Sequence, residues 1–159
     1  MDATRSEGMT LPAPSTVGEL AARRRGVDWA RALTSQAMTR PVLTIEVSES
    51  LWDAWQLLSV SGLRHLVVVE DGRTLGVISD RMILTDLPLA EERMRARGVG
   101  DLLSRAPART VLDTAPLAEV ARTMARYSAE AVPVLDALGR LVGIVTASDL
   151  VRWWADDGS

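Results

Sequence analysis

The stretch LGVIS at residues 75–79 recurs as VGIVT at residues 142–146, an offset of 67 residues. Upstream, LVVVE at 66–70 matches VPVLD at 132–136, and TI at 44–45 matches TV at 110–111, both at an offset of 66. The offset changes once, in the loop after Glu70, where an insertion costs little. The chain therefore contains two copies of one unit. Such a repeat indicates the overall architecture, so it is considered before any local motif.

Each copy predicts the same order of elements: a strand, an amphipathic helix, two strands joined by a tight turn, and a second helix. The first strands are predicted at residues 42–45 and 109–112. Asp71-Gly72 and Leu138-Gly139 supply turns, since glycine tolerates the positive φ that tight hairpins need. Apolar residues recur at i, i+3, i+4 and i+7 in both amphipathic helices, as expected of one buried face: Leu51, Ala54, Trp55 and Leu58, then Leu117, Val120, Ala121 and Met124.

We therefore expect an α+β fold of two tandem β-α-β-β-α repeats related by a pseudo-two-fold axis. Two copies of one surface pair isologously, and neither copy can bury its sheet face alone at this size. The predicted organisation is a tail and amphipathic helix at 1–34, repeat 1 at 35–88, a connector at 89–98 and repeat 2 at 99–159. Residues 1–18 read as a flexible tail and residues 19–38 as helical, with an interruption at Gly26. The run Arg23-Arg24-Arg25 is either a solvated helix face or a docking patch for an acidic partner or a ligand phosphate.

Composition narrows the classes of function. Of 159 residues 47% are apolar and none is Cys, which favours a folded domain and excludes disulfides and thiolate chemistry. The longest apolar run, LVVV at 66–69, is too short to span a membrane, and no secretory signal is evident. The net charge of −3 argues against nucleic-acid binding. Lys, Asn and Phe have AT-rich codons, so their absence indicates a GC-rich genome. We expect a bacterial, cytoplasmic protein.

Four segments carry a family resemblance: MTRP at 38–41, HLVVV at 65–69, AVPVL at 131–135 and GIVTASDL at 143–150. Over residues 35–155 the chain resembles tandem cystathionine-β-synthase (CBS) domains, also called a Bateman module. The resemblance implies a regulatory module rather than an enzyme. It implies an adenosyl ligand (AMP, ADP, ATP or S-adenosylmethionine) in the cleft between the repeats, and an effector protein that responds to cleft or dimer geometry.

The same resemblance places the ligand on Thr146 and Asp149. A carboxylate accepts hydrogen bonds from both ribose hydroxyls, and a hydroxyl at a helix start donates to phosphate. Thr-x-x-Asp is also a capping box, and the two interpretations are compatible in part. Of the other residues of this expected site, Gly143 lets the backbone approach the ligand closely and Ile144 forms an apolar wall. The base is expected to lie against Thr39, Pro41, Val42, Leu63, Arg64 and His65. Ser148 completes the set.

Copy one departs from the pattern because Met82 stands where the ribose carboxylate belongs. A thioether accepts hydrogen bonds poorly, so we expect at most one good nucleotide site per chain. Glu130 corresponds to Arg64 and would repel phosphate. The weaker second site is predicted from Ser79, Asp80, Arg109 and Ala131.

His65 is the one histidine of the chain. Without a second His or a Cys it predicts no intrinsic metal site, although Mg²⁺ could bridge a nucleotide through carboxylates. No nucleophile motif accompanies it, so we expect no catalytic residues. A lone strand histidine is more often structural.

Three tryptophans favour a homodimer. Trp52 lies off the apolar stripe, and adjacent Trp153 and Trp154 cannot both face the same way from one helix. Tryptophan is enriched at interfaces, so these three residues predict either a dimer seam or a large local core. The alternative function is a ligand-free dimerisation scaffold that kept the fold and lost sensing.

Overall fold

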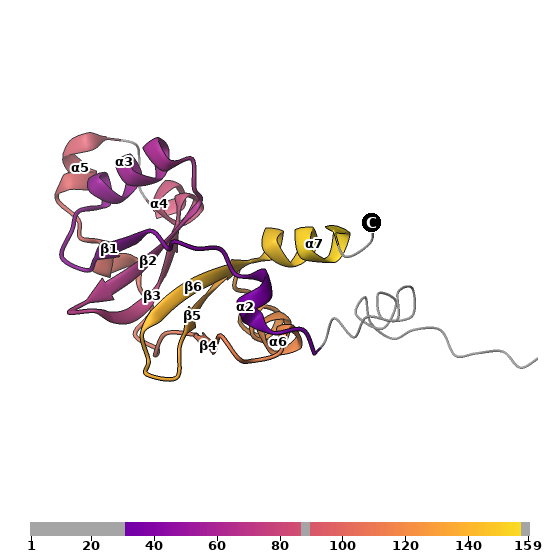
Figure 1. Ribbon diagram of the computed structural model, residues 1–159. Coiled ribbons are helices and arrows are strands. Elements are labelled where there is room, and N and C mark those ends of the chain that lie inside the picture. The colour runs from indigo at the N-terminus through magenta and orange to yellow at the C-terminus, as the bar shows by residue number, and fades with distance from the viewer. Residues whose placement is uncertain (1–30, 87–89, 157–159) are drawn as a thin grey trace, which may run out of the picture.

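The computed structural model describes residues 31–86 and 90–156 and consists of two small α/β halves side by side (Figure 1). Repeat 1 comprises β1 (Thr44–Glu46), α3 (Leu51–Ser61), β2 (His65–Glu70), β3 (Arg73–Ser79) and α4 (Asp80–Asp86). Repeat 2 comprises β4 (Val111–Leu112), α6 (Leu117–Tyr127), β5 (Ala131–Leu135), β6 (Leu141–Thr146) and α7 (Ala147–Asp156). The predicted order of elements is confirmed in both copies.

Each repeat holds one three-stranded sheet. In repeat 1, β1 runs parallel to β2, and β2 pairs antiparallel with β3; β4, β5 and β6 repeat this arrangement. The leading strands begin two residues later than predicted, and the hairpin strands extend further toward their turns. Asp71 and Gly72 have φ values of 48° and 78°, which form a tight turn. The β2–β3 hydrogen-bond ladder therefore continues up to the residues that flank this turn.

Short segments precede and link the two repeats. Helix α2 (Thr34–Ala37) is the described end of the helix predicted over residues 19–38; the rest of that prediction, with the tail and the Arg23–Arg25 run, lies outside the described residues. The predicted connector contains α5 (Glu91–Arg95), whose Met94 is buried in the core of repeat 1, and η1 (Val99–Leu102) follows it.

The core has three parts. One cluster fills each repeat, with α3 and α6 burying their predicted apolar faces against the sheets. A third cluster lies between the two sheets and contains Val67, Val69, Ala131 and Ile144. The sheets therefore meet face to face through short apolar side chains.

Each repeat is completed by the segment that precedes the other repeat's first strand. Met38, ahead of β1, packs on the core of repeat 2, and a Cβ added to Gly143 would overlap its sulfur. Leu103, ahead of β4, packs on the core of repeat 1, 2.9 Å from where a Cβ of Gly76 would lie. The glycines of the two repeated motifs are therefore needed for space, and the repeats exchange their leading segments.

Trp153 and Trp154 face different ways, as adjacent residues of one helix must. Trp52 and Trp55 pack half-buried against the core of repeat 1, and the Arg95 guanidinium lies 5.3 Å from the centroid of the Trp52 ring. Trp153 packs on the core of repeat 2, whereas Trp154 is exposed. Of the three residues predicted for a seam, Trp154 presents the most open surface.

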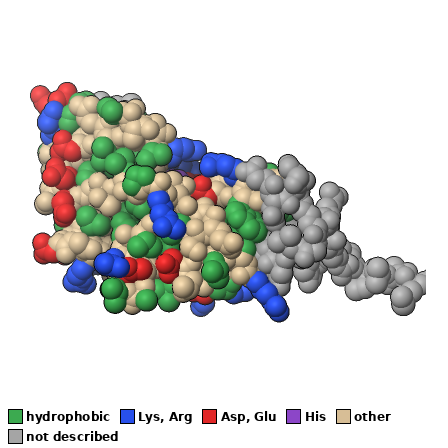
Figure 2. Space-filling view, in the orientation of Figure 1, with side chains coloured by type: hydrophobic (Ala, Val, Ile, Leu, Met, Phe, Trp, Pro, Cys, Tyr) green, Lys and Arg blue, Asp and Glu red, His purple; other side chains and the backbone are tan. Residues whose placement is uncertain are grey.

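The surface of one face mixes both signs of charge. In Figure 2 acidic side chains gather at the edge of repeat 1 and arginines are scattered, with no continuous basic stripe on this face. Within the described ranges 31–86 and 90–156, no helix has the length and apolar character that crossing a bilayer demands.

Candidate functional site

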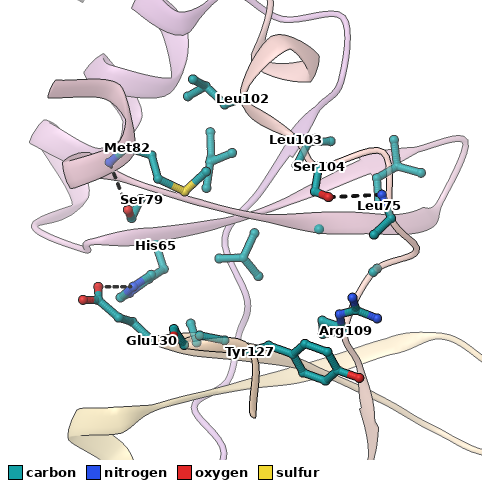
Figure 3. Close-up of a pocket in the computed structure, with 18 of the residues that line it drawn as sticks. His65, Leu75, Ser79, Met82, Leu102, Leu103, Ser104, Arg109, Tyr127 and Glu130 are labelled. Carbon is teal, nitrogen blue, oxygen red and sulfur yellow. Dashed lines mark hydrogen bonds and ion pairs between the residues drawn. The ribbon is translucent and has the colours of Figure 1, made fainter. Parts of the chain in front are cut away.

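A cavity of about 470 Å³ lies between the two repeats, within the size range of small-molecule sites (Figure 3). We call it the Ser79 pocket. Its walls come from three parts of the chain: the β2–β3 edge and start of α4 in repeat 1, the segment ahead of β4, and the α6–β5 junction of repeat 2. Its lining includes His65, Ser79, Arg81, Met82, Leu103, Arg109, Tyr127, Glu130 and Ala131.

Ser79 closes β3 and caps α4. Its side chain is buried, and its hydroxyl accepts a 3.2 Å hydrogen bond from the backbone N–H of Met82. Met82 is 37% exposed and holds the position that Asp149 holds in repeat 2. The start of α4 therefore carries a hydroxyl cap but no carboxylate at the position of Asp149, and the Asp80 carboxylate pairs with Arg64 outside the pocket lining.

Glu130 brings a carboxylate into the pocket from the opposite wall. It is the counterpart of Arg64, since both backbone carbonyls accept from the first residue of the next helix. One carboxylate oxygen lies 3.4 Å from Arg81 Nη1 and the other 3.8 Å from His65 Nε2, so residues of both repeats meet here (Figure 3).

His65 stands opposite Ser79 in the β2–β3 register. Burial lowers its pKa from 6.5, and the nearby charges of Glu130 and Asp80 oppose this effect. Its Nε2 atom is buried and has no hydrogen-bond partner among the described residues. At neutral pH the ring is therefore uncharged and can still accept or donate one hydrogen bond.

Arg109 and Tyr127 form the other end of the pocket. The Arg109 guanidinium carbon lies 3.9 Å from the centroid of the Tyr127 ring, a cation–π contact. Within the described part of the chain no acidic side chain pairs with Arg109. The pocket is thus polar in two places, with a carboxylate at one end and a cation at the other (Figure 3).

The Thr146–Asp149 pair forms the capping box that the sequence allowed. Asp149 is 7% exposed, and its Oδ2 accepts from both the backbone N–H and the hydroxyl of Thr146 at 2.8 Å. Its Oδ1 accepts from the hydroxyl of Thr39 at 3.2 Å, and Arg152 lies 3.6 Å away. Both carboxylate oxygens are therefore satisfied within the chain, and the nucleotide role of this pair stays a prediction.

The structure gathers only part of the expected ligand set around Asp149. Thr39 reaches the carboxylate and forms a β-bridge with Ile144, next to Gly143. His65 instead lines the Ser79 pocket, because it pairs with Ser79 in the ladder. The others lie apart: Arg64 pairs with Asp80, Pro41 and Val42 line an open groove with Arg140, and Leu63 and Ser148 are exposed.

The structure also brings together part of the weaker site. Ser79, Arg109 and Ala131 all line the Ser79 pocket. Asp80 does not, because its carboxylate accepts from the N–H of Arg81 in its own helix and pairs with Arg64. Sequence reasoning missed Tyr127 and Leu103, whose positions depend on how the repeats pack. In residues 31–86 and 90–156, no three His, Asp or Glu side chains cluster as metal ligands.

Sequence comparison finds the CBS domain model at residues 32–88 and 99–156. A CBS domain-containing protein of Dictyostelium discoideum is 33% identical over 131 residues, covering 76% of this chain and 90% of the relative. Seven further relatives are longer, and the chain spans 17% to 42% of their length.

Solved structures show the same architecture. CBSX2, a CBS-pair protein of Arabidopsis thaliana, matches in its AMP complex with a TM-score of 0.66 and 28% identity, covering 80% of this chain and 98% of that one. A CBS domain pair in complex with 5′-methylthioadenosine and S-adenosyl-L-methionine matches with a TM-score of 0.67 and 25% identity, covering 79% and 97%.

Proposed function

Because this chain belongs to the CBS domain family and carries the domain twice, we propose that it is a regulatory module that binds an adenosyl ligand between its repeats. The observation that carries the proposal is the Ser79 pocket, a cavity built from both repeats with convergent polar groups. Two similar CBS pairs hold AMP, or 5′-methylthioadenosine and S-adenosyl-L-methionine, which supports a ligand of this class.

The geometry favours the Ser79 pocket over the Thr146–Asp149 pair. A ribose at Asp149 would have to share the buried carboxylate with the hydroxyls of Thr39 and Thr146. In the Ser79 pocket, by contrast, His65 and Glu130 line the wall and point toward each other, and Glu130 is half-exposed (Figure 3). The ligand therefore enters the Ser79 pocket first, and Mg²⁺ is required only if a polyphosphate accompanies it.

The proposed output is a change in how the two repeats sit together. Glu130 joins repeat 2 to Arg81 and His65 of repeat 1 at the pocket wall. A ligand that binds more tightly at one spacing of the two repeats than at another increases the population with that spacing. An effector protein would read the shift. We also propose a homodimer through α7, whose Val151 and Trp154 are exposed.

The alternative is the ligand-free scaffold. It is favoured by Asp149, whose two carboxylate oxygens both accept hydrogen bonds within the chain, and by Met82 in place of the equivalent carboxylate. On this alternative, the Ser79 pocket admits solvent and the module acts through its protein contacts alone.

A thermal-shift and calorimetry panel separates these functions. The panel contains adenosine, AMP, ADP, ATP and S-adenosylmethionine, with and without Mg²⁺. A ligand at about 100 times its dissociation constant adds roughly 2.7 kcal/mol to the free energy of unfolding, which raises the midpoint by several degrees. No shift across the panel supports the scaffold.

Two variants locate the site. Ala106 is exposed and lines the Ser79 pocket, so Ala106→Trp narrows the cavity; the exposed neighbour Arg105 lies outside its lining, and Arg105→Trp is the matched control. Binding lost only in Ala106→Trp assigns the ligand to the Ser79 pocket. Binding lost in Asp149→Asn and kept in Ala106→Trp assigns it to the Thr146–Asp149 pair.

A further inference from the structure

The Ser79 pocket lacks the carboxylate that repeat 2 has three residues after its capping hydroxyl, but it has one on its other wall. Met82 occupies the α4 position whose equivalent in α7 is Asp149, and a thioether is a weak acceptor. Glu130 reaches the same end of the cavity from repeat 2, and its side chain remains 52% exposed (Figure 3). The pocket therefore keeps an anionic acceptor, supplied by the opposite repeat.

The spacing of Glu130 and His65 suits a bridging hydroxyl. The carboxylate oxygen and His65 Nε2 are 3.8 Å apart, which is too long for a direct hydrogen bond. Because Nε2 is buried, a ligand oxygen that bridges the two groups reaches it only when the half-exposed Glu130 side chain shifts aside, and it then lies about 2.8 Å from each. Nε2 is buried with no hydrogen-bond partner among the described residues, and such an atom gains from a ligand that pairs it.

We propose, resting on the function proposed above, that Glu130 and His65 bind the ribose hydroxyls of an adenosyl ligand in the Ser79 pocket. Repeat 2 thus replaces the carboxylate that repeat 1 lost at Met82. The carboxylate accepts from one hydroxyl of the ribose, and the imidazole pairs with the same oxygen or its neighbour.

Charge then orients the ligand. Glu130 is only partly neutralised by Arg81 at 3.4 Å, so a phosphate is disfavoured at this end. Arg109 stands at the other end of the cavity and has no acidic partner among the described residues. The pocket selects an intact ribose diol at Glu130 and admits negative charge only toward Arg109 (Figure 3).

A merely structural role for these residues makes a different prediction. If Glu130, His65 and Arg81 only hold the repeats together, removing the carboxylate weakens every ligand equally. If Glu130 reads the ribose, its removal changes the ratio of affinities for ligands with and without hydroxyls. The ratio is therefore the readout.

The test is calorimetric titration of adenosine and 2′,3′-dideoxyadenosine into the full chain, the Glu130→Gln variant and the control Glu119→Gln. Glu119 is an exposed acid on α6 outside the pocket lining. The unmodified protein and Glu119→Gln should prefer adenosine by about tenfold or more, as a hydrogen bond to a charged group predicts. In Glu130→Gln the preference should fall to about threefold or less.

Two results overturn the proposal. If Glu130→Gln keeps the full preference while Asp149→Asn loses it, the ribose lies at Asp149; the adenosyl function then stands and this assignment fails. If neither adenosine nor any member of the ligand panel binds, the proposed function fails together with it. Unfolding curves of each variant check that the half-exposed substitution leaves the fold intact.

Discussion

The hydroxyl of Thr39 donates a 3.2 Å hydrogen bond to Oδ1 of Asp149, joining residues 110 positions apart. Thr39 precedes the first strand of repeat 1, whereas Asp149 lies in the first turn of the last helix of repeat 2. The leading segment of one repeat is therefore tied to the helix start of the other, at the carboxylate that the sequence marks for ribose.

The hydrogen bond between Thr39 and Asp149 should make the effects of substituting these two residues on the free energy of unfolding non-additive. Asp149→Ala should lower the free energy of unfolding by about 2 kcal/mol, because it removes the cap and leaves the Thr39 and Thr146 hydroxyls without their acceptor. Thr39→Val removes only the donor and should cost about 1 kcal/mol. Urea unfolding of both single variants and the double variant measures the coupling, expected near 1 kcal/mol; additive costs would contradict it.

The two motif glycines should respond differently to alanine. Gly143→Ala places a Cβ against the sulfur, Cγ and Cβ of Met38, whereas Gly76→Ala meets only the terminal Cδ2 of Leu103. Gly143→Ala should therefore cost about 1–3 kcal/mol and Gly76→Ala less. Urea unfolding measures both, and Met38→Ala added to Gly143→Ala should recover part of the loss. No recovery would argue against the overlap.

Stability should fall in mild acid because of His65. Burial lowers its pKa in the folded chain, although Glu130 and Asp80 oppose the shift and Arg64 adds to it. Between the lowered pKa and the unfolded value near 6.5 the unfolded state binds more protons. Stability is therefore complete above that value and declines as the pH drops below it.

The measurement is urea unfolding between about pH 8 and about pH 5. His65→Asn should flatten the curve below neutrality. Glu130→Gln removes a charge that raises the pKa of His65, so the decline should be larger and should extend to lower pH. An unmodified protein whose pH profile matches that of His65→Asn would contradict this assignment.

Met82→Asp should stabilise the chain. The new carboxylate can accept from the N–H and hydroxyl of Ser79, as Asp149 does from Thr146, and it places a negative charge in the first turn of α4. The expected gain is about 0.5–1 kcal/mol, or a midpoint roughly 1–4 °C higher. Calorimetry against the control Met82→Leu measures the change; equal midpoints would mean that the cap does not form.

The proposed dimer can be checked on α7. Val151 is 62% exposed beside Trp154, and a charge placed there should weaken an apolar seam. Val151→Glu should shift the sedimentation profile toward monomer. Leu138→Glu, at an exposed hairpin turn, is the control and should leave association unchanged. Equal profiles for both variants and the unmodified chain would place any seam elsewhere.

Local structure could be predicted where the sequence repeats. The hairpin turn at Asp71-Gly72, the apolar face of α6 and the cap at Thr146 all follow from short-range rules, and the structure confirms them. Contacts between repeats could not be predicted, because they depend on how the two sheets meet. His65 shows this: its strand was predicted, but its orientation toward Glu130 comes from the ladder register and the packing of repeat 2.

The exchange of leading segments has a consequence for the chain as a whole. A break in the connector would yield two fragments, each exposing a groove beside a motif glycine and each carrying the side chain that fills the other's groove, Met38 or Leu103. Mixing the fragments would fill both grooves at once, so the halves should recombine by complementation and neither should persist alone.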